Sequence, residues 1–174
     1  MKCTKLLFIL VFFTGINSFA QKSVGYGCEL SVLSIKPNVR IWMSKTTGFE
    51  VFAGSASELG DFNPNDAEAG FKILKTIQYN RTYRTYFGLV GKWKWLNVYG
   101  ATNKINLPIP GLLIGKEWYN KRIHQRGFAI ELGYQYGVKE FVVYNPVSQS
   151  PIGKDKFEEF PLIINLRYSF YKKK

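Results

Sequence analysis

The sequence has little of what most enzymes and metalloproteins use at their sites. It contains one histidine, His124, and two cysteines, of which Cys3 lies in the first 20 residues. One histidine and one cysteine cannot form a typical zinc site, and Cys28 alone cannot form an internal disulfide. The segment from Gly111 to Lys116 has the wrong spacing for a phosphate loop. We therefore expect no enzyme, no metal ion and no other cofactor.

Long apolar runs are also scarce, and the clearest one lies at the N-terminus. Leu6–Phe13 is uninterrupted, follows two lysines, and precedes the small residues Ser18 and Ala20. This pattern predicts a secretory signal peptide over residues 1–20, cleaved before Gln21. The run is too short for a membrane-spanning helix, which takes about 20 residues. No later segment is long and apolar enough either, so a mature chain that enters a membrane must do so as a closed barrel.

The sequence has few acidic residues, and basic residues outnumber them two to one. The chain has 24 Lys and Arg against 12 Asp and Glu, and the mature part keeps 22 of the basic residues, a balance of +10. An exported basic chain is not expected to bind nucleic acid. Anionic membrane lipid and lipopolysaccharide headgroups are the partners that this charge favours.

Aromatic residues and alternating patterns are what the sequence does have. Aromatics make up 17% of the chain, and Gly occurs 16 times. Segments in which apolar residues alternate with small or polar ones predict strands, because successive side chains in a strand point to opposite faces. The predicted strands cover residues 24–35, 39–44, 49–54, 70–79, 83–90, 109–119, 128–138 and 160–170. An even strand number allows antiparallel closure with both termini on one side.

The connections between these segments also follow a rule. Those at residues 44–48, 80–81 and 120–125 are short, and those at 58–69, 92–108 and 139–158 are long. The connection at Lys36-Pro37-Asn38 is the exception, because it falls on the side of the long connections but is short. Short turns on the periplasmic side and long outer loops are typical of membrane barrels.

The last segment shows the pattern most clearly. Leu162, Ile164, Leu166, Tyr168 and Phe170 share one face, opposite Ile163, Asn165, Arg167 and Ser169. Residues 22–171 resemble a small outer-membrane β-barrel of Gram-negative bacteria, of the OmpA/OmpX-like, Bacteroidota type. The resemblance implies an all-β, eight-stranded antiparallel up-and-down transmembrane barrel over residues 21–174, monomeric and located in the outer membrane. It also implies a C-terminal assembly signal, read by the barrel assembly machinery and carried by Leu166, Tyr168 and Phe170. The chain differs from the family in continuing to Lys174, where members usually end at the aromatic residue.

Charged residues on the opposite face of the strands would lie in the lumen. We expect an ion-pair network there, formed by Glu29, Arg40, Glu50, Arg84, Glu117, Glu131 and Arg167, with Lys72 on the same face. An eight-stranded lumen is only just wide enough for its own side chains, so we expect it to be plugged. A proton or ion path is the functional alternative. Lys75 and Lys116 instead fall on the lipid face; Lys116 is close to a turn, whereas Lys75 requires a β-bulge to change its phase.

The function that follows is that of a non-enzymatic outer-membrane barrel with a structural or surface-interaction role. One alternative is a lipid-modifying enzyme of the lipid A deacylase type, which would need a role for His124. Another is a secreted, soluble, lipocalin-like carrier, whose apolar face would point inward. A calcium loop around Asp61 and Asp66 is a weaker possibility, because a lysine, Lys72, stands where the loop needs its final glutamate.

Overall fold

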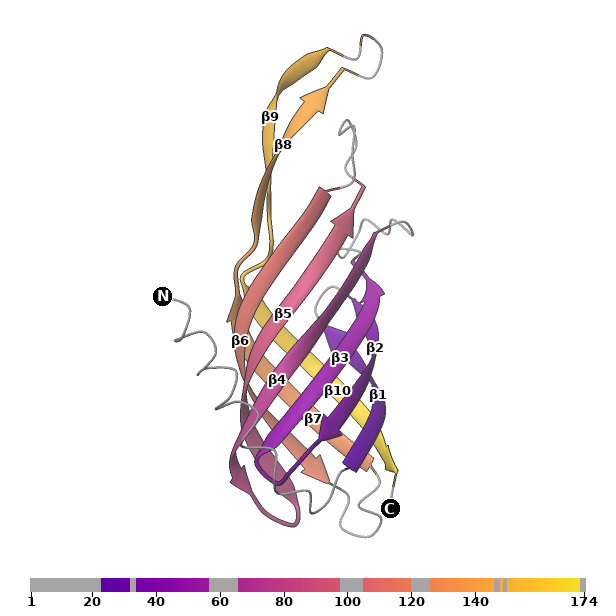
Figure 1. Cartoon of the computed structure of the whole chain (residues 1–174), viewed down its shortest axis with the longest axis vertical. Coiled ribbons are helices and arrows are strands. Elements are labelled where there is room, and N and C mark those ends of the chain that lie inside the picture. The colour runs from indigo at the N-terminus through magenta and orange to yellow at the C-terminus, as the bar shows by residue number, and fades with distance from the viewer. Residues whose placement is uncertain are drawn as a thin grey trace, which may run out of the picture.

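The structure, a computed structural model, describes residues 23–31, 34–56, 66–97, 105–119, 126–145, 148 and 150–172. The predicted signal peptide lies outside the described residues. Eight strands form a closed antiparallel barrel, and two more form a separate sheet that extends from one end of it (Figure 1). The barrel consists of β1 (Ser23–Ser31), β2 (Ile35–Trp42), β3 (Thr47–Ser55), β4 (Ala67–Tyr79), β5 (Tyr83–Leu96), β6 (Ile105–Tyr119), β7 (Arg126–Gln135) and β10 (Leu162–Lys172). The separate sheet consists of β8 (Val138–Tyr144) and β9 (Pro151–Glu158).

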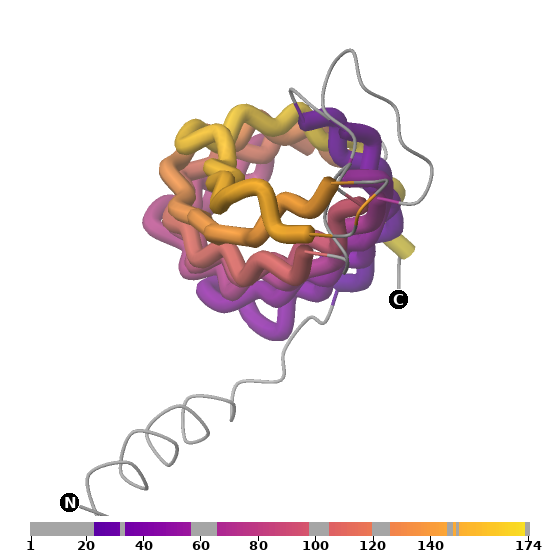
Figure 2. The backbone as a smooth tube through the Cα atoms, turned by 90° about the horizontal axis from the view of Figure 1, so that it is seen from above, coloured from indigo at the N-terminus to yellow at the C-terminus, as the bar shows by residue number. Residues whose placement is uncertain are grey.

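Neighbouring strands of the barrel follow chain order, and β10 pairs with both β7 and β1 to close the ring (Figure 2). The predicted all-β, eight-stranded antiparallel up-and-down barrel is therefore confirmed. The described residues include no helix that is long and apolar enough to cross a membrane. We call the end with the β2–β3 and β4–β5 turns the turn side, and the end with the β8–β9 sheet the loop side.

The two faces of the barrel are the reverse of those of a water-soluble protein. In β7, the side chain of Leu132 is 51% exposed, whereas its neighbour Glu131 is completely buried. In β10, Leu166, Tyr168 and Phe170 are exposed and Arg167 is buried. Because successive side chains alternate between faces, each strand presents apolar groups outward and places polar or charged groups in the lumen.

The lumen is filled by side chains. Apart from its charged residues, it contains a cluster of buried apolar groups that includes Trp42, Leu74, Leu113 and Ile163. Glycine provides room where large groups meet: a Cβ on Gly115 would lie 2.6 Å from the ring of Tyr86. A filled interior is what eight strands allow.

The predicted turn at Lys36-Pro37-Asn38 is wrong, because these residues lie inside β2. Lys36 and Asn38 point inward and are buried, and Pro37 points outward. A proline has no N–H for a ladder, yet Pro37 is tolerated because β2 pairs only with β1 at this point; the ladder to β3 begins at Asn38. The chain reverses before β2 instead, where the N–H of Ser31 donates to the carbonyl of Ser34 at 2.8 Å.

The three predicted long loops are shorter than expected. Within the first, β4 already begins at Ala67; within the second, β5 continues to Leu96 and β6 begins at Ile105. Pro108 and Pro110 lie in the part of β6 that pairs with β5 alone, so their missing N–H groups break no second ladder. The third predicted loop, 139–158, contains most of the β8–β9 hairpin.

Lys75 lies on the outer face, as its phase predicts. A register shift does occur in β4, but it lies between Thr76 and Gln78 and leaves Ile77 as the extra residue, so it does not turn Lys75 inward. Lys75 pairs with Thr47, the first residue of β3, which places it at the turn side. Its position near the end of the barrel, rather than a bulge, accounts for its charge on this face.

Candidate functional site: the polar lumen

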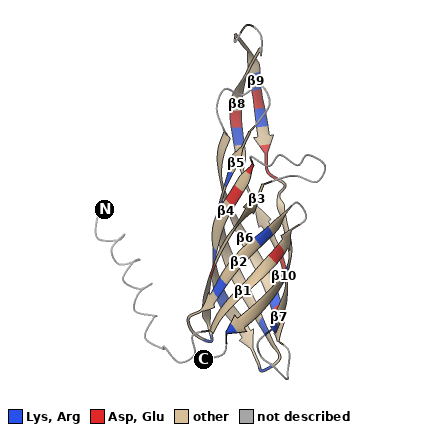
Figure 3. Cartoon of the chain, turned by 90° about the vertical axis from the view of Figure 1, so that its right-hand side faces the viewer, with Lys and Arg blue, Asp and Glu red and all other residues tan. Residues whose placement is uncertain are grey.

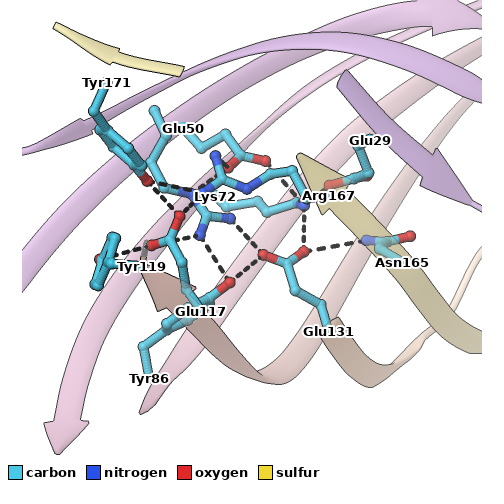
Figure 4. Close-up of polar contacts among 11 residues, drawn as sticks. Glu29, Glu50, Lys72, Tyr86, Glu117, Tyr119, Glu131, Asn165, Arg167 and Tyr171 are labelled. Atoms are coloured by element: carbon cyan, nitrogen blue, oxygen red, sulfur yellow. Dashed lines mark hydrogen bonds and ion pairs between the residues drawn. The ribbon is translucent and has the colours of Figure 1, made fainter. Parts of the chain in front are cut away.

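One buried residue from each barrel strand contributes to a single layer of polar contacts (Figure 4). These eight residues, which we call the central network, are Glu29, Arg40, Glu50, Lys72, Tyr86, Glu117, Glu131 and Arg167, and none is more than 1% exposed. They come from β1, β2, β3, β4, β5, β6, β7 and β10, in that order. The strand alternation places each of them inside, and the closure of the barrel brings them together.

Arg40 and Lys72 hold one half of the central network. The guanidinium of Arg40 donates to Glu50 and Glu131, and to the hydroxyl of Tyr86 at 2.7 Å. That hydroxyl donates to Glu131 at 2.6 Å. The ammonium of Lys72 contacts Glu29, and lies 2.6 Å from Glu131 and 3.0 Å from Glu50. Each cation therefore bridges carboxylates from different strands.

Arg167 holds the other half. It pairs with Glu117, lies 3.4 Å from a carboxylate oxygen of Glu50, and donates to the hydroxyl of Tyr171 at 3.0 Å. Tyr171 also donates to Glu117, and Tyr119 does so at 2.9 Å. Tyr171, one residue beyond the expected end of the assembly signal, is thus an inward-facing partner of the network.

The central network contains four carboxylates and three cations. The hydroxyl of its member Tyr86, together with those of Tyr119 and Tyr171 beside the network, contributes the additional donors that buried carboxylates require. A fully buried charge is tolerated only when it is paired and hydrogen-bonded, and each of these carboxylates contacts at least one cation. The arrangement binds the strands to one another and leaves no exposed group of the layer to act on a substrate.

A second group of ion pairs lies nearer the loop side. Lys36 pairs with Glu68, Lys94 lies 2.7 Å from Glu159, and Lys92 lies 3.0 Å from Glu159 and 3.8 Å from Glu68. We call these five residues the upper cluster. Burial by itself would raise the pKa of Glu159, in the link between β9 and β10, but Lys92 and Lys94 outweigh burial and hold that pKa below its ordinary value. The cavity between the two groups measures about 30 Å³, space for a water molecule or two.

The sequence-based interpretation missed the upper cluster although a signal was present. Lys92 and Lys94 alternate with Trp93 and Trp95, in the same phase as the rest of β5. The sequence predicts a loop over their segment and over Glu68, and a turn at Lys36. Continuing the alternation past these points would have placed all four inside.

Six of the seven residues expected in the network lie together in the lumen, and Arg84 lies apart. Its guanidinium stacks 3.6 Å from the ring centroid of Trp42 and 4.8 Å from that of Tyr79. Arg84 lies opposite Glu117 in the β5–β6 ladder, but the ion pairs of the described residues do not include one between them. Glu117 instead contacts Arg167, Tyr119 and Tyr171. Aromatic faces are thus the main neighbours of Arg84.

The residues of the expected assembly signal all point outward. Leu166, Tyr168 and Phe170 are exposed, and the rings of Tyr168 and Phe170 meet edge to face with centroids 5.1 Å apart. Phe170 pairs with Tyr26 of β1 and with Arg126 of β7. The three residues therefore lie on the strand that closes the barrel.

In the part of the chain that the structure describes, no three His, Cys, Asp or Glu side chains gather to hold a metal ion. His124 and Asp61 lie outside the described residues. Asp66 accepts a hydrogen bond from the backbone N–H of Asn97 at 2.7 Å. Compared with known proteins, the chain matches no family model, no curated protein and no solved structure.

Proposed function

We propose that the mature chain is an integral outer-membrane β-barrel protein with a plugged lumen and a structural or surface-interaction role, without catalytic activity. The observation that carries this proposal is the reversal of the two faces, with charges inside and large apolar side chains outside. A continuous exposed apolar surface of this extent is unfavourable in water and marks contact with a membrane or a partner.

The dimensions of the outer face support a bilayer. On β5, outward aromatics stand at Tyr83 and at Trp93, ten residues apart, with Phe87 and Leu89 between them. At ~3.3 Å per residue and a tilt of ~40°, this separation is about 25 Å along the membrane normal. Outer-membrane barrels have an apolar band of about this height between two aromatic girdles.

The lumen argues against the carrier alternative. A lipocalin-like carrier needs an apolar cavity that can hold a ligand, whereas this interior is charged and its cavity measures about 30 Å³. The deacylase alternative depends on His124, which lies outside the described residues. The exposed β8–β9 sheet, which rises from the loop side (Figure 1), is the part of the chain that supports a surface-interaction role.

Cysteine labelling on intact Gram-negative cells tests this proposal. In a Cys28→Ser background, Gly153→Cys on β9 should react with an impermeant maleimide, since an added Cβ at this position meets nothing within 4 Å. The matched variant Arg81→Cys, in the β4–β5 turn, should react only after the outer membrane is permeabilised. Labelling of Arg81→Cys on intact cells would contradict the orientation, and a protein that stays soluble without detergent would contradict the membrane assignment.

A further inference from the structure

The outer face of the barrel carries charge of one sign only, and at one end only. Four exposed cations point outward from β4, β6, β7 and β10, namely Lys75, Lys116, Arg126 and Lys172. Among the described residues, every Asp and Glu lies in the lumen, at Asp66 on the loop side, or in the β8–β9 sheet. In Figure 3, basic residues lie near the lower rim of the barrel, whereas β8 and β9 carry both basic and acidic residues.

No carboxylate of the described residues neutralises these cations. None of the four forms an ion pair among the described residues. Two of them lie against aromatic rings instead: the Lys116 ammonium is 4.5 Å from the ring centroid of Tyr83 and 5.4 Å from that of Trp118, and the Arg126 guanidinium is 5.8 Å from that of Phe170. A ring face attracts a cation but leaves its charge uncompensated.

The rings form a continuous row across four adjacent strands. Tyr83 pairs with Trp118, Trp118 with Phe128, and Phe128 with Tyr168. The Trp118 and Phe128 rings stack with centroids 6.2 Å apart. We define the turn-side belt as Tyr83, Lys116, Trp118, Arg126, Phe128, Tyr168 and Phe170.

We propose that the turn-side belt binds the phosphate groups of anionic phospholipids in the leaflet at the turn side. This inference rests on the proposed membrane location. Aromatic rings are favoured at the headgroup level, and lysine and arginine side chains place their charges there. A phosphate is the counter-ion available at that depth. Lys116 on β6 and Arg126 on β7 lie four residues apart along the ladder, since Lys116 pairs with Ile130, and each can meet a headgroup of its own. The belt fits phospholipid rather than lipopolysaccharide because it lies at the end opposite the β8–β9 sheet.

Tryptophan quenching by brominated lipids in reconstituted bilayers tests the proposal on the mature protein. The background variant carries Trp93→Phe and Trp95→Phe, which leaves Trp118 at the belt and Trp42 buried in the lumen. Brominated phosphatidylglycerol and brominated phosphatidylcholine are compared in mixed bilayers. At each cation we expect the anionic lipid to associate about fivefold more strongly at low salt, the factor that corresponds to about 1 kcal/mol for one nearby basic residue, and to lose this preference at high salt.

The preference should disappear in the double variant Lys116→Gln, Arg126→Gln. It should remain in Lys139→Gln, Lys154→Gln, which removes the same charge from the exposed β8–β9 sheet. Equal quenching by the two lipids, or an unchanged preference in the belt variant, overturns the belt while leaving the membrane location intact. Quenching of Trp118 by neither lipid overturns both proposals.

Discussion

Replacing Arg167 with alanine should destabilise the barrel strongly, because Arg167 is the main cation for Glu117. In its absence the other cation near Glu117 is Arg40, at 3.8 Å, and the central network holds four carboxylates against two cations. The Arg167–Glu50 contact at 3.4 Å alone represents about 5 kcal/mol of attraction at an effective dielectric constant of about 20. Desolvation offsets most of that gain, but losing one partner of a buried pair still costs about 3–5 kcal/mol.

Urea unfolding of the mature protein in detergent micelles measures this loss, followed by tryptophan fluorescence and by the heat-modifiable shift on gels. Lys154→Ala, on the exposed β9 strand, is the matched control and should change the unfolding free energy by less than about 0.5 kcal/mol. Arg167→Met combined with Glu117→Gln should recover part of the stability, because the unpaired carboxylate is gone. A loss below about 1 kcal/mol for Arg167→Ala, or no recovery in the double variant, would refute the role given to this pair.

Three further outcomes follow from the same contacts. Gly115→Ala should destabilise the barrel by about 1–3 kcal/mol, since the added Cβ lies 2.6 Å from the Tyr86 ring; unchanged urea unfolding would contradict this packing. Planar bilayers containing the wild-type protein should show no steady large conductance, and a stable porin-like current would contradict the plugged lumen. Deleting Lys172–Lys174 should leave assembly intact, whereas deleting Tyr168–Lys174 removes five of the eight β1–β10 pairs and Tyr171, so that form should lose the heat-modifiable shift.

The strand number and the faces of the strands could be predicted because both follow from a period of two. Glu131 and Arg167 sit in segments that alternate without interruption, and their inward position follows directly. The partners of these residues could not be predicted in the same way. Glu131 meets Arg40 of β2 across the lumen, and this contact depends on the tilt and stagger of the closed barrel, which no single strand encodes.

The ends of the strands were predicted less well, and proline is the physical reason. The sequence predicts a turn at Pro37 and a loop that ends at Pro108, since proline cannot donate to a ladder, whereas Pro110 falls inside the predicted strand 109–119. Near the loop side, however, the barrel strands differ in length, and each of these prolines has a neighbouring strand on one side only. The alternation of inward and outward residues predicts the strands correctly in this region. Proline is disfavoured where a strand has neighbours on both sides, and these prolines do not lie at such positions.

The central network also favours one register of the strands over others. The alternation of apolar residues opposes a slip of one residue but does not oppose a slip of two. If β10 slipped by one residue against β7, Arg167 would face outward, at a cost of about 2–4 kcal/mol in mid-bilayer. A slip of two residues would keep every apolar side chain outside, so the alternation alone does not oppose it. That slip would place Asn165 or Ser169 where Arg167 now lies, and Glu117 would lose its main cation. Every barrel strand except β5, whose member is Tyr86, contributes a charged member, so the same argument applies to the other strands around the ring. The buried ion pairs thus discriminate among the registers that hydrophobicity leaves equivalent.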